Sequence, residues 1–361
     1  MYYHGLLDNI VVETVKSHFD PLNGSTYWNN YASIRGIDPF NEVKDFHSFE
    51  KLVSFKSEKE SVEFERALRH EPLSAFIPKS LQSQYFWPVQ TGSTTGQPKY
   101  GSWFDPAWTR NMGFIDRCLD FYGFPRGANW LVAGPSGPHN HLHAADSLLK
   151  MRGGGCFAID LDPAFIKIMI GEQMIDAHDR YIQHIIDQCR NILQTQEVSV
   201  IFTTGKILEL ILSEVSAADL KNVKAVMHAG IELSPQTAKE AKRLLGNQIP
   251  IIGSYGTVMT GPAMQVISSA DEESKFVYAP NFPDTHFEIV SSSGDIVEYG
   301  ERGQIKSYRF SSDFMVPGFL ERDFATKIKP IGYLSQISPR GWIGDPSSPP
   351  LLRKGRSQGV Y

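Results

Sequence analysis

The sequence predicts an α/β fold in which a mostly parallel, helix-flanked sheet is followed by a smaller antiparallel β unit. Between about residues 86 and 262, short apolar or β-branched runs alternate with segments of helical periodicity. After residue 262, short strand-like runs follow one another across turn residues. Repeated β–α units favour parallel strands covered on both faces, and consecutive short strands favour antiparallel pairing.

The N-terminal 85 residues are expected to be helical and irregular. Residues 58–69 are polar with scattered apolar positions, which is typical of a surface helix. Two strands are expected next, at residues 86–91 and 99–104, and the segment between them is rich in glycine and hydroxyl side chains. No internal repeat is apparent, so a repeat architecture is not expected.

Strands and helices then alternate up to residue 262. The first helix is expected at residues 105–124, with Asp105 as its N-cap and Pro106 in its first position. The other elements expected here are strands at 129–134, 198–204, 223–230 and 249–256, and helices at 176–194, at 206–214 and from Ser234 to Gly246.

Past residue 262 the expected strands are residues 263–268, 275–280, 285–291 and 303–310. The final segment is rich in proline and serine and then basic, which indicates a linker or an exposed tail. The expected organisation is therefore a helical and irregular region (1–85), an α/β subdomain (86–262), a β-rich subdomain (263–345) and a tail (346–361).

Composition excludes several classes of protein. Of the 361 residues, 41% are hydrophobic and 21% are charged, which is an ordinary globular mixture. The net charge of −5 disfavours binding to nucleic acid or to an anionic membrane, and no run of apolar residues is long enough to span a bilayer. The three widely spaced cysteines exclude a disulfide framework and a zinc knuckle. The N-terminus lacks the basic start of a signal peptide, so the cytoplasm is the expected compartment.

The loop at residues 91–99 (TGSTTGQPK) has the chemistry that a polyphosphate needs. Glycines allow successive backbone N–H groups to point at one centre, and hydroxyls and a cation add further donors. These candidate residues are Thr91, Gly92, Ser93, Thr94, Thr95, Gly96 and Lys99. The loop is not a Walker A motif, since no Gly-Lys-Ser/Thr follows and no helix begins there. A plain hairpin loop is the alternative, and the particular residue run favours phosphate.

This run resembles the phosphate loop of the acyl-adenylate-forming (AMP-binding) enzymes, whose pattern is Ser/Thr-Gly-hydroxyls-Thr-Gly-x-Pro-Lys. The phenylacetate–CoA ligase and acyl-protein synthetase branch is the most similar. Four further segments follow in the family's order: an acyl-pocket segment (134–139), an adenine-lining turn (228–235), the start of the Tyr-Gly-x-Ser/Thr-Glu motif (253–256) and the stretch that carries the family's aspartate (317–328). The resemblance implies the fold of that family's large N-terminal domain.

The resemblance also implies ATP or AMP as the nucleotide, and a role for each matched residue. Tyr255 would stack on adenine, and Asp323 would accept both ribose hydroxyls. Lys99 and Thr95 are the implied catalytic residues. The implied nucleotide site further contains Ala229, Gly230, Ile231, Ser254, Gly256 and Thr257, and the implied acid site contains Gly134, Ser136, Gly137 and His139.

Some of these residues have simpler explanations. Tyr255 could pack in the core, and Asp323 could pair with the adjacent Arg322. Three alternating histidines, at positions 139, 141 and 143, would share one face of a strand and could hold zinc. The segment turns into an apparent helix, however, so His139 is expected in the acid pocket, the other two are expected as capping or core residues, and no metal site is predicted.

The sequence departs from the family's pattern in two places. Met259 stands where the family has the glutamate that holds Mg²⁺, and Val258 stands where it has a hydroxyl. Mg²⁺ is expected with ATP, although its usual ligand is missing; Thr257 is a candidate for the lost hydroxyl, and Glu232 and Glu301 are candidates for the lost acid. Residues 355–360 resemble the hinge before the family's C-terminal lid, and the lid itself, with its catalytic lysine, is expected to be absent.

Two functions remain open. The first is ATP-dependent activation of an aromatic carboxylic acid, such as a phenazine carboxylate of antibiotic biosynthesis, as an acyl-AMP for a reductase or acceptor protein. The second is a catalytically degenerate carrier or scaffold that binds nucleotide and aromatic acid. A phosphotransferase is disfavoured because no Walker-type or kinase metal aspartate is found. A homodimer is expected only from the resemblance.

Overall fold

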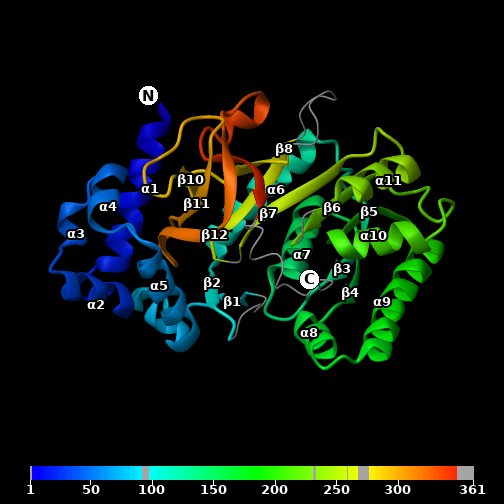
Figure 1. Cartoon of the computed structure of the whole chain (residues 1–361), viewed down its shortest axis with the longest axis horizontal. Helices are drawn as coiled ribbons and strands as arrows, with labels where there is room; N and C mark the ends of the chain where they lie inside the picture. Colours follow the sequence, from blue (N-terminus) through cyan, green and yellow to red (C-terminus); the bar gives the residue numbers. More distant parts are fainter. Residues whose placement is uncertain (1, 92–96, 231–232, 258, 267–275, 348–361) are drawn as a thin grey trace.

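A computed structural model describes residues 2–91, 97–230, 233–257, 259–266 and 276–347 of the chain. Helices lie at α1 (Tyr2–Phe19), α2 (Thr26–Arg35), α3 (Pro39–Glu42), α4 (Phe46–Leu52), α5 (Glu58–His70), α6 (Asp105–Phe121), α7 (Asn140–Arg152), α8 (Pro163–Gly171), α9 (Ile175–Thr195), α10 (Gly205–Glu214) and α11 (Pro235–Leu245). In Figure 1, α1–α5 gather at one side of the molecule and α8–α11 at the other, with the strands between them. Within the described part of the chain, no helix has the length and apolar character that crossing a membrane requires.

The strands form one large mixed sheet and one small hairpin. They lie at β1 (Trp87–Gln90), β2 (Tyr100–Trp103), β3 (Asn129–Gly134), β4 (Cys156–Asp160), β5 (Val198–Thr204), β6 (Ala225–Ala229), β7 (Ile251–Thr257), β8 (Gly261–Val266), β9 (Val277–Pro280), β10 (Thr285–Val290), β11 (Arg302–Arg309), β12 (Val316–Ile328) and β13 (Trp342–Ser347). The large sheet has the order β10-β11-β12-β13-β9-β8-β7-β6-β5-β3-β4, and β1 pairs with β2. The α/β fold class predicted from the sequence is confirmed.

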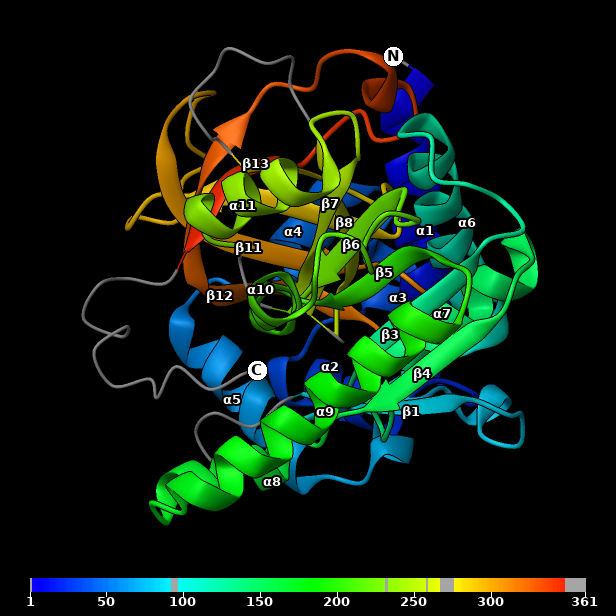
Figure 2. The same cartoon turned by 90° about the vertical axis from the view of Figure 1, so that its right-hand side faces the viewer.

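The parallel half of the sheet consists of β4, β3, β5, β6 and β7. Its strands alternate between two hydrophobic cores because successive side chains point to opposite faces. On β5, Val200 and Phe202 belong to the core under α6 and α7, and Ile201 belongs to the core under α8–α11. Figure 2 shows α10 and α11 lying over the strands on this second face. Burial on both faces explains why these strands are almost continuously apolar.

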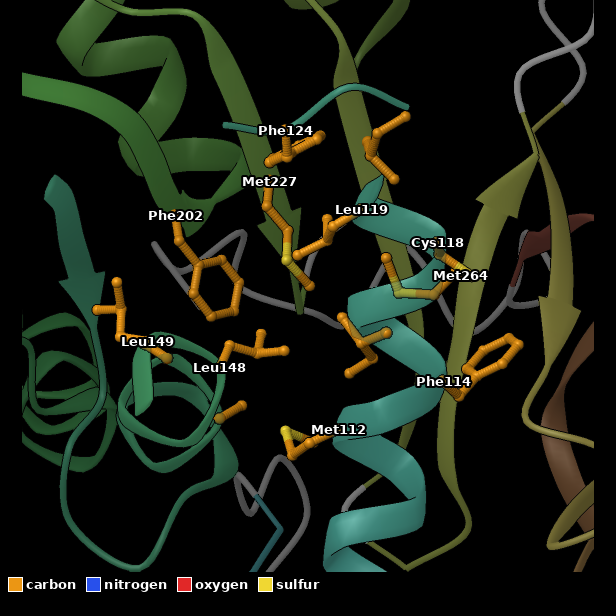
Figure 3. Packing of buried hydrophobic residues seen from close by; sticks show 14 of the residues in the cluster. Met112, Phe114, Cys118, Leu119, Phe124, Leu148, Leu149, Phe202, Met227 and Met264 are labelled. Atoms are coloured by element: carbon orange, nitrogen blue, oxygen red, sulfur yellow. The ribbon is translucent and has the colours of Figure 1, made fainter. Parts of the chain in front are cut away.

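The first of these cores supports the wall of the cavity described below. Figure 3 shows Met112 and Leu119 of α6 facing Leu148 of α7, together with Phe202 of β5 and Met227 of β6. All five side chains are buried. The two helices and two strands are therefore held together by one continuous apolar cluster.

The antiparallel half begins where β8 pairs with β7, and it continues the same sheet. The predicted change of pattern near residue 262 therefore marks a change of strand direction within one sheet. Helices α1–α5 pack on this half: Trp28 of α2, Phe49 of α4 and Phe64 of α5 share a core with Tyr308 of β11. The division of the chain into four regions stays a prediction.

Most predicted elements are present, with some differences at their ends. The strands predicted at residues 129–134 and 198–204 are β3 and β5, with the same bounds. Ser234 caps α11, and its side chain accepts a hydrogen bond from the N–H of Thr237, as expected for an N-cap.

The predicted helix after β2 is present as α6 and begins at Asp105, but its N-cap residue and its C-terminal end differ from the prediction. Phe104 is the N-cap of α6, Asp105 lies in its first turn, and the helix ends at Phe121. Asp105 there adds a negative charge near the helix N-terminus, which is favourable without capping. At the C-terminal end of the described chain, β13 extends to Ser347, so the expected tail overlaps a strand by two residues; residues 348–361 lie outside the described part.

Candidate functional site

A cavity of about 380 Å³ lies at the C-terminal ends of β5, β6 and β7, against β2, α6 and the start of α7. This is the edge of a parallel sheet at which ligands are usually bound, because loops and helix N-termini converge there. Nine of the predicted site residues line the cavity: Thr91, Lys99, His139, Ala229, Gly230, Ser254, Tyr255, Gly256 and Thr257.

The other predicted residues fall into two groups. Gly92, Ser93, Thr94, Thr95, Gly96 and Ile231 lie outside the described residues, as do Glu232 and Val258. Gly134, Ser136, Gly137 and Asp323 are described but are not in the cavity wall. Ser136 hydrogen-bonds Asp160 through both its N–H and its hydroxyl, at 2.9 and 2.7 Å. Its side chain is therefore engaged with the protein, which leaves its predicted contact with the acid unsupported by this geometry.

Tyr255 and Asp323 meet although they are 68 residues apart. The Tyr255 hydroxyl on β7 donates to Asp323 Oδ2 on β12 across 3.4 Å. Burial, with the nearby carboxylates of Asp323 and Glu321, raises the pKa of Tyr255 well above its usual value, so the phenol stays a neutral donor. The Tyr255 ring also packs against Tyr278 and Phe287, so Tyr255 is at once a packed residue and a residue of the cavity wall.

Lys99 is held by a carboxylate that the sequence analysis did not single out. Its Nζ lies 2.7 Å from Glu65 Oε1 on α5, and Arg69 and Arg322 lie 3.3 and 3.4 Å from the same carboxylate. Burial acts to raise the pKa of Glu65, but the hydrogen bond and charge of Lys99, with the two arginines, lower it. Arg69 also donates to the backbone carbonyl of Gln97, a residue of the phosphate-loop segment.

This cluster of one carboxylate and three cations has a net positive charge. A polyphosphate carries more negative charge and more acceptor oxygens than one carboxylate, so it can replace Glu65 as the partner of these cations. Arg322, the residue suggested as an ion-pair partner of Asp323, lies 3.4 Å from the Glu65 carboxylate. The only hint of Glu65 in the sequence was its place in a polar helix, which does not reveal a contact made 34 residues away.

Met259 does not offer a metal site. Its side chain is 6% exposed and belongs to the core shared with α1–α5. A Cβ atom on Gly101 would come within 3.0 Å of the Met259 sulfur, so the thioether fills the space that this glycine leaves open. Among the described residues, no group of three or more His, Cys, Asp or Glu side chains could hold a metal ion. The buried thioether of Met259 therefore supplies no ligand for Mg²⁺.

The suggested replacements for the lost motif residues are placed elsewhere. The Thr257 hydroxyl accepts from the N–H groups of Met259 and Thr260, so it closes the turn between β7 and β8. Glu301 accepts from the N–H of Glu298 before β11 and is not part of the cavity wall. Glu301 therefore brings no carboxylate to the cavity. Thr257 lines the cavity, but its hydroxyl is engaged in the turn.

A large part of the cavity wall is aromatic or apolar. The residues Trp103, Trp108, Met112, Ile115, Phe202 and Met227 contribute to it. Trp103 is fixed from behind by the buried guanidinium of Arg309, which lies 3.5 Å from the indole ring centre. A flat hydrophobic ligand fits such a wall better than a charged one.

The three alternating histidines have three different environments. His139 is the N-cap residue of α7 and lines the cavity, and burial lowers its pKa. His141 is buried and stacks on Phe202 with ring centres 4.0 Å apart. His143 stacks between Trp87 and Trp108, at 4.3 and 4.4 Å. Because the segment is helical, the three side chains do not converge.

Gly134 acts through His141 rather than by lining the cavity. A Cβ atom at Gly134 would lie 2.5 Å from His141 Cδ2, so only glycine leaves room for this ring. His141 itself lines the cavity, a role the sequence analysis did not assign to it. The residue type alone carried no indication of this contact, since a buried histidine is an equally ordinary core residue.

Comparisons with known proteins agree on the fold. The model of the AMP-binding enzyme family matches residues 168–309, from α8 to the end of β11. An open conformation of 2-hydroxyisobutyryl-CoA ligase, in complex with 2-HIB-AMP and CoA, has a TM-score of 0.67 at 12% identity, covering 93% of this chain and 71% of the ligase. The same ligase in its postadenylation state gives 0.69 at 12% identity, covering 94% and 65%. A search of curated proteins finds no match.

The chain thus spans about two thirds of the length of the ligase that it resembles, 65% of it in the postadenylation form. At this level of identity the likeness concerns the fold, which is that of the adenylate-forming enzymes.

Proposed function

We propose that the protein activates an aromatic carboxylic acid with ATP, forming an acyl-AMP that a partner enzyme reduces or transfers. The observation that carries the proposal is one cavity that joins two kinds of surface. Trp103, Trp108 and Phe202 give the cavity an aromatic surface, and Tyr255 and Lys99 line the same cavity. The match to the AMP-binding enzyme family over residues 168–309 supports the same nucleotide.

The chemistry requires one displacement at phosphorus. A carboxylate oxygen of the acid attacks the α-phosphorus of ATP and forms a new P–O bond. The bond from that phosphorus to its bridging oxygen breaks, and pyrophosphate leaves with the electron pair. Lys99, exchanged from Glu65 to phosphate, would neutralise charge on the leaving group, and donors placed where charge develops speed such reactions.

The nucleoside would be held on the Tyr255 side of the cavity. Asp323 lies within 3.4 Å of the Tyr255 hydroxyl and is proposed to accept ribose hydroxyls. Ala229 and Gly230 are proposed to border the base, since both line the cavity and Ala229 pairs with Ser254, the residue before Tyr255. Mg²⁺ would arrive with ATP as part of the substrate, because Met259 offers it no ligand.

The size and flatness of the aromatic wall favour a planar polycyclic acid, and a phenazine carboxylate is a specific candidate. This choice goes with the phenylacetate–CoA ligase-like branch and with a role in antibiotic biosynthesis, in which a reductase or acceptor protein consumes the acyl-AMP. The requirement for ATP favours the cytoplasm as the compartment. The homodimer also stays part of this proposal.

A second candidate function is binding of nucleotide and aromatic acid without turnover. Two observations favour it: Met259 is built into a core, and Lys99 is already paired with Glu65. A carrier or scaffold needs the pocket and the nucleoside contacts but no cation at the α-phosphate.

Pyrophosphate exchange into ATP distinguishes the two functions. The full chain is incubated with ATP, labelled pyrophosphate and a panel of benzoate, naphthoate and phenazine carboxylates, and acyl-AMP is followed by mass spectrometry. We expect exchange that depends on the aromatic acid and is absent with a small aliphatic acid. Tight binding of acid and nucleotide in calorimetry, with no exchange for any acid, would support the carrier instead.

A further inference from the structure

The two edge strands of the large sheet, β10 and β4, end the sheet in different ways. The chain folds back over the outer edge of β10, where Val297 donates its N–H to the carbonyl of Ile289 at 2.9 Å. Ile296 also forms an antiparallel bridge with Val290. Strand β4 pairs with β3 and with no other described strand. An open edge of this kind is a template for pairing with another chain.

Strand β4 (CFAID) lacks the usual protection of an edge. Proteins block open edges with lysine, proline, a bulge or a covering segment. The strand contains neither lysine nor proline, and its register with β3 runs without a shift from Cys156 to Asp160. Cys156, Ala158 and Asp160 are exposed. The carboxylate of Asp160, at the end of the strand, accepts two hydrogen bonds from Ser136.

One hydrogen bond shows which backbone groups of β4 face outward. Trp130 of β3, which lies opposite Cys156, donates its N–H to the carbonyl of Gly155 at 2.8 Å. Successive residues of a strand turn their N–H and C=O groups to opposite sides, so every second residue of β4 faces away from β3. The outward-facing residues are Cys156, Ala158 and Asp160. Each presents one donor and one acceptor to the open edge.

We propose that two copies of this chain pair through β4, antiparallel and with Ala158 on the two-fold axis. In this register Ala158 lies opposite the partner's Ala158, and Cys156 lies opposite the partner's Asp160. Two facing residues of such a pair exchange both hydrogen bonds, so every outward N–H and C=O group of the strand is satisfied. This inference gives the homodimer of the proposed function an interface, and it does not depend on acid activation.

A second copy suits this edge for three reasons. Ala158, which has the smallest side chain of the strand, lies on the axis, where the two chains approach each other. The two Asp160 carboxylates lie at opposite ends of the pair, about 14 Å apart at 3.4 Å per residue, so like charges do not meet. Pairing of β4 with β4 also stops at two copies, whereas pairing of β4 with another edge would build an open filament.

The test begins with the oligomeric state of the full chain. Sedimentation equilibrium is measured at protein concentrations from about 1 to 100 μM, and we expect a monomer–dimer equilibrium with a dissociation constant in that range.

Two substitutions at Ala158 should break the dimer and spare the fold. The N–H of Ala158 faces outward, so Ala158→Pro removes no hydrogen bond to β3, and edge strands accept proline on that side. Ala158→Lys places two ammonium groups opposite each other across the axis. Each should raise the dissociation constant of the dimer by about tenfold or more. Ala158→Ser, which keeps the N–H and a small side chain, is the matched control and should leave the dimer intact.

Cys156 measures the register without an engineered residue. Cys156 is exposed, and Cys118 and Cys189 are buried. In the proposed pair the two Cys156 residues lie four positions apart along the strands, about 14 Å. A bismaleimide that spans about 15 Å should therefore link two wild-type chains, and one that spans about 8 Å should not. Cys156→Ser should give no covalent dimer with either reagent.

The outcomes separate this inference from the proposed function. A wild-type chain that stays monomeric at about 100 μM overturns the inference. A dimer that keeps its dissociation constant in both Ala158→Pro and Ala158→Lys, or that the longer reagent does not link through Cys156, overturns it as well. Acid-dependent pyrophosphate exchange is measured on the same preparations. If exchange were absent while the dimer behaved as expected, the proposed function would fail and this interface would stand.

Discussion

The two halves of the sheet bring different chemistry to one cavity. From the parallel half and its helices come uncharged groups: Phe202, Met227 and the neutral ring of His141. The antiparallel half, with α5 and β12, places charge next to two residues of the cavity wall: Glu65 of α5 pairs with Lys99, and Asp323 of β12 accepts a hydrogen bond from Tyr255. The difference arises because the parallel strands are covered on both faces, which leaves little place for ions. Ring binding and phosphate binding should therefore be separable by substitution.

The largest expected effect is that of Lys99→Ala. Loss of one preorganised cation typically lowers a rate by about 10²–10³-fold, so acid-dependent pyrophosphate exchange should fall by that amount. Affinity for ATP should fall more than affinity for AMP, and binding of an aromatic acid should be unchanged. Exchange assays and calorimetry on the same preparation measure all three quantities.

Arg322→Ala is the control for this prediction. Arg322 contacts the same carboxylate but is 45% exposed in its side chain, so its loss should change exchange only slightly. If Lys99→Ala weakened ATP and AMP equally, or weakened the aromatic acid as well, the separation of the two sides of the cavity would be wrong.

A smaller effect is expected for Asp323→Ala. A charge-assisted hydrogen bond to ribose contributes roughly 1.5–3 kcal/mol, so ATP and AMP should both lose about tenfold to hundredfold in affinity. Acid binding should again be spared. Tyr255→Phe removes only the hydroxyl that donates a hydrogen bond to Asp323, and it should lower nucleotide affinity less than Asp323→Ala does. Unchanged nucleotide affinity in Asp323→Ala would remove this residue from the site.

The fold could be predicted from the sequence further than the site could. Strands β3 and β5 have the predicted bounds because both are buried along nearly their whole length and their sequences are mostly apolar, with β-branched residues prominent in β5. Strand β4 (CFAID) lies at the sheet edge, where Cys156, Ala158 and Asp160 are exposed. Its apolar run is only four residues long and follows three glycines, and the strand was not predicted. Helix α7 begins among histidines after a Gly-Pro pair, which hid its start.

For the site, nine of the residues predicted from motif order line one cavity, Lys99, Tyr255 and Gly256 among them, and their roles stay predictions. The partners of those residues were not predictable from local patterns. Glu65 reaches Lys99 across 34 positions, and Tyr255 reaches Asp323 across 68. Likewise, the space that Gly134 leaves for His141 exists only once β3 and α7 are packed. Such contacts depend on the tertiary fold and on side-chain volume.

The smallest expected effect, and the one that tests how the charged side works, is that of Glu65→Gln. Glu65 competes with phosphate for Lys99, so removing its charge should strengthen ATP binding by up to about fivefold and leave AMP nearly unchanged. Glu63→Gln is the control, because Glu63 lies on the same helix but pairs with the exposed Lys59.

Glu65→Gln should also change how the stability of the protein depends on pH. The pKa of Glu65 is lowered in the folded protein from 4.5, so its ion pairs contribute stability above pH 4.5, and that contribution is lost as the pH falls through the lowered value. Urea denaturation between pH 3 and 7 should therefore show a shallower acid loss of stability in Glu65→Gln than in the wild type. If the stability of Glu65→Gln fell with pH as steeply as that of the wild type, the titration of Glu65 would not be the source of the acid loss. If the variant bound ATP more weakly, Glu65 would hold Lys99 in its active position instead of competing with phosphate for it.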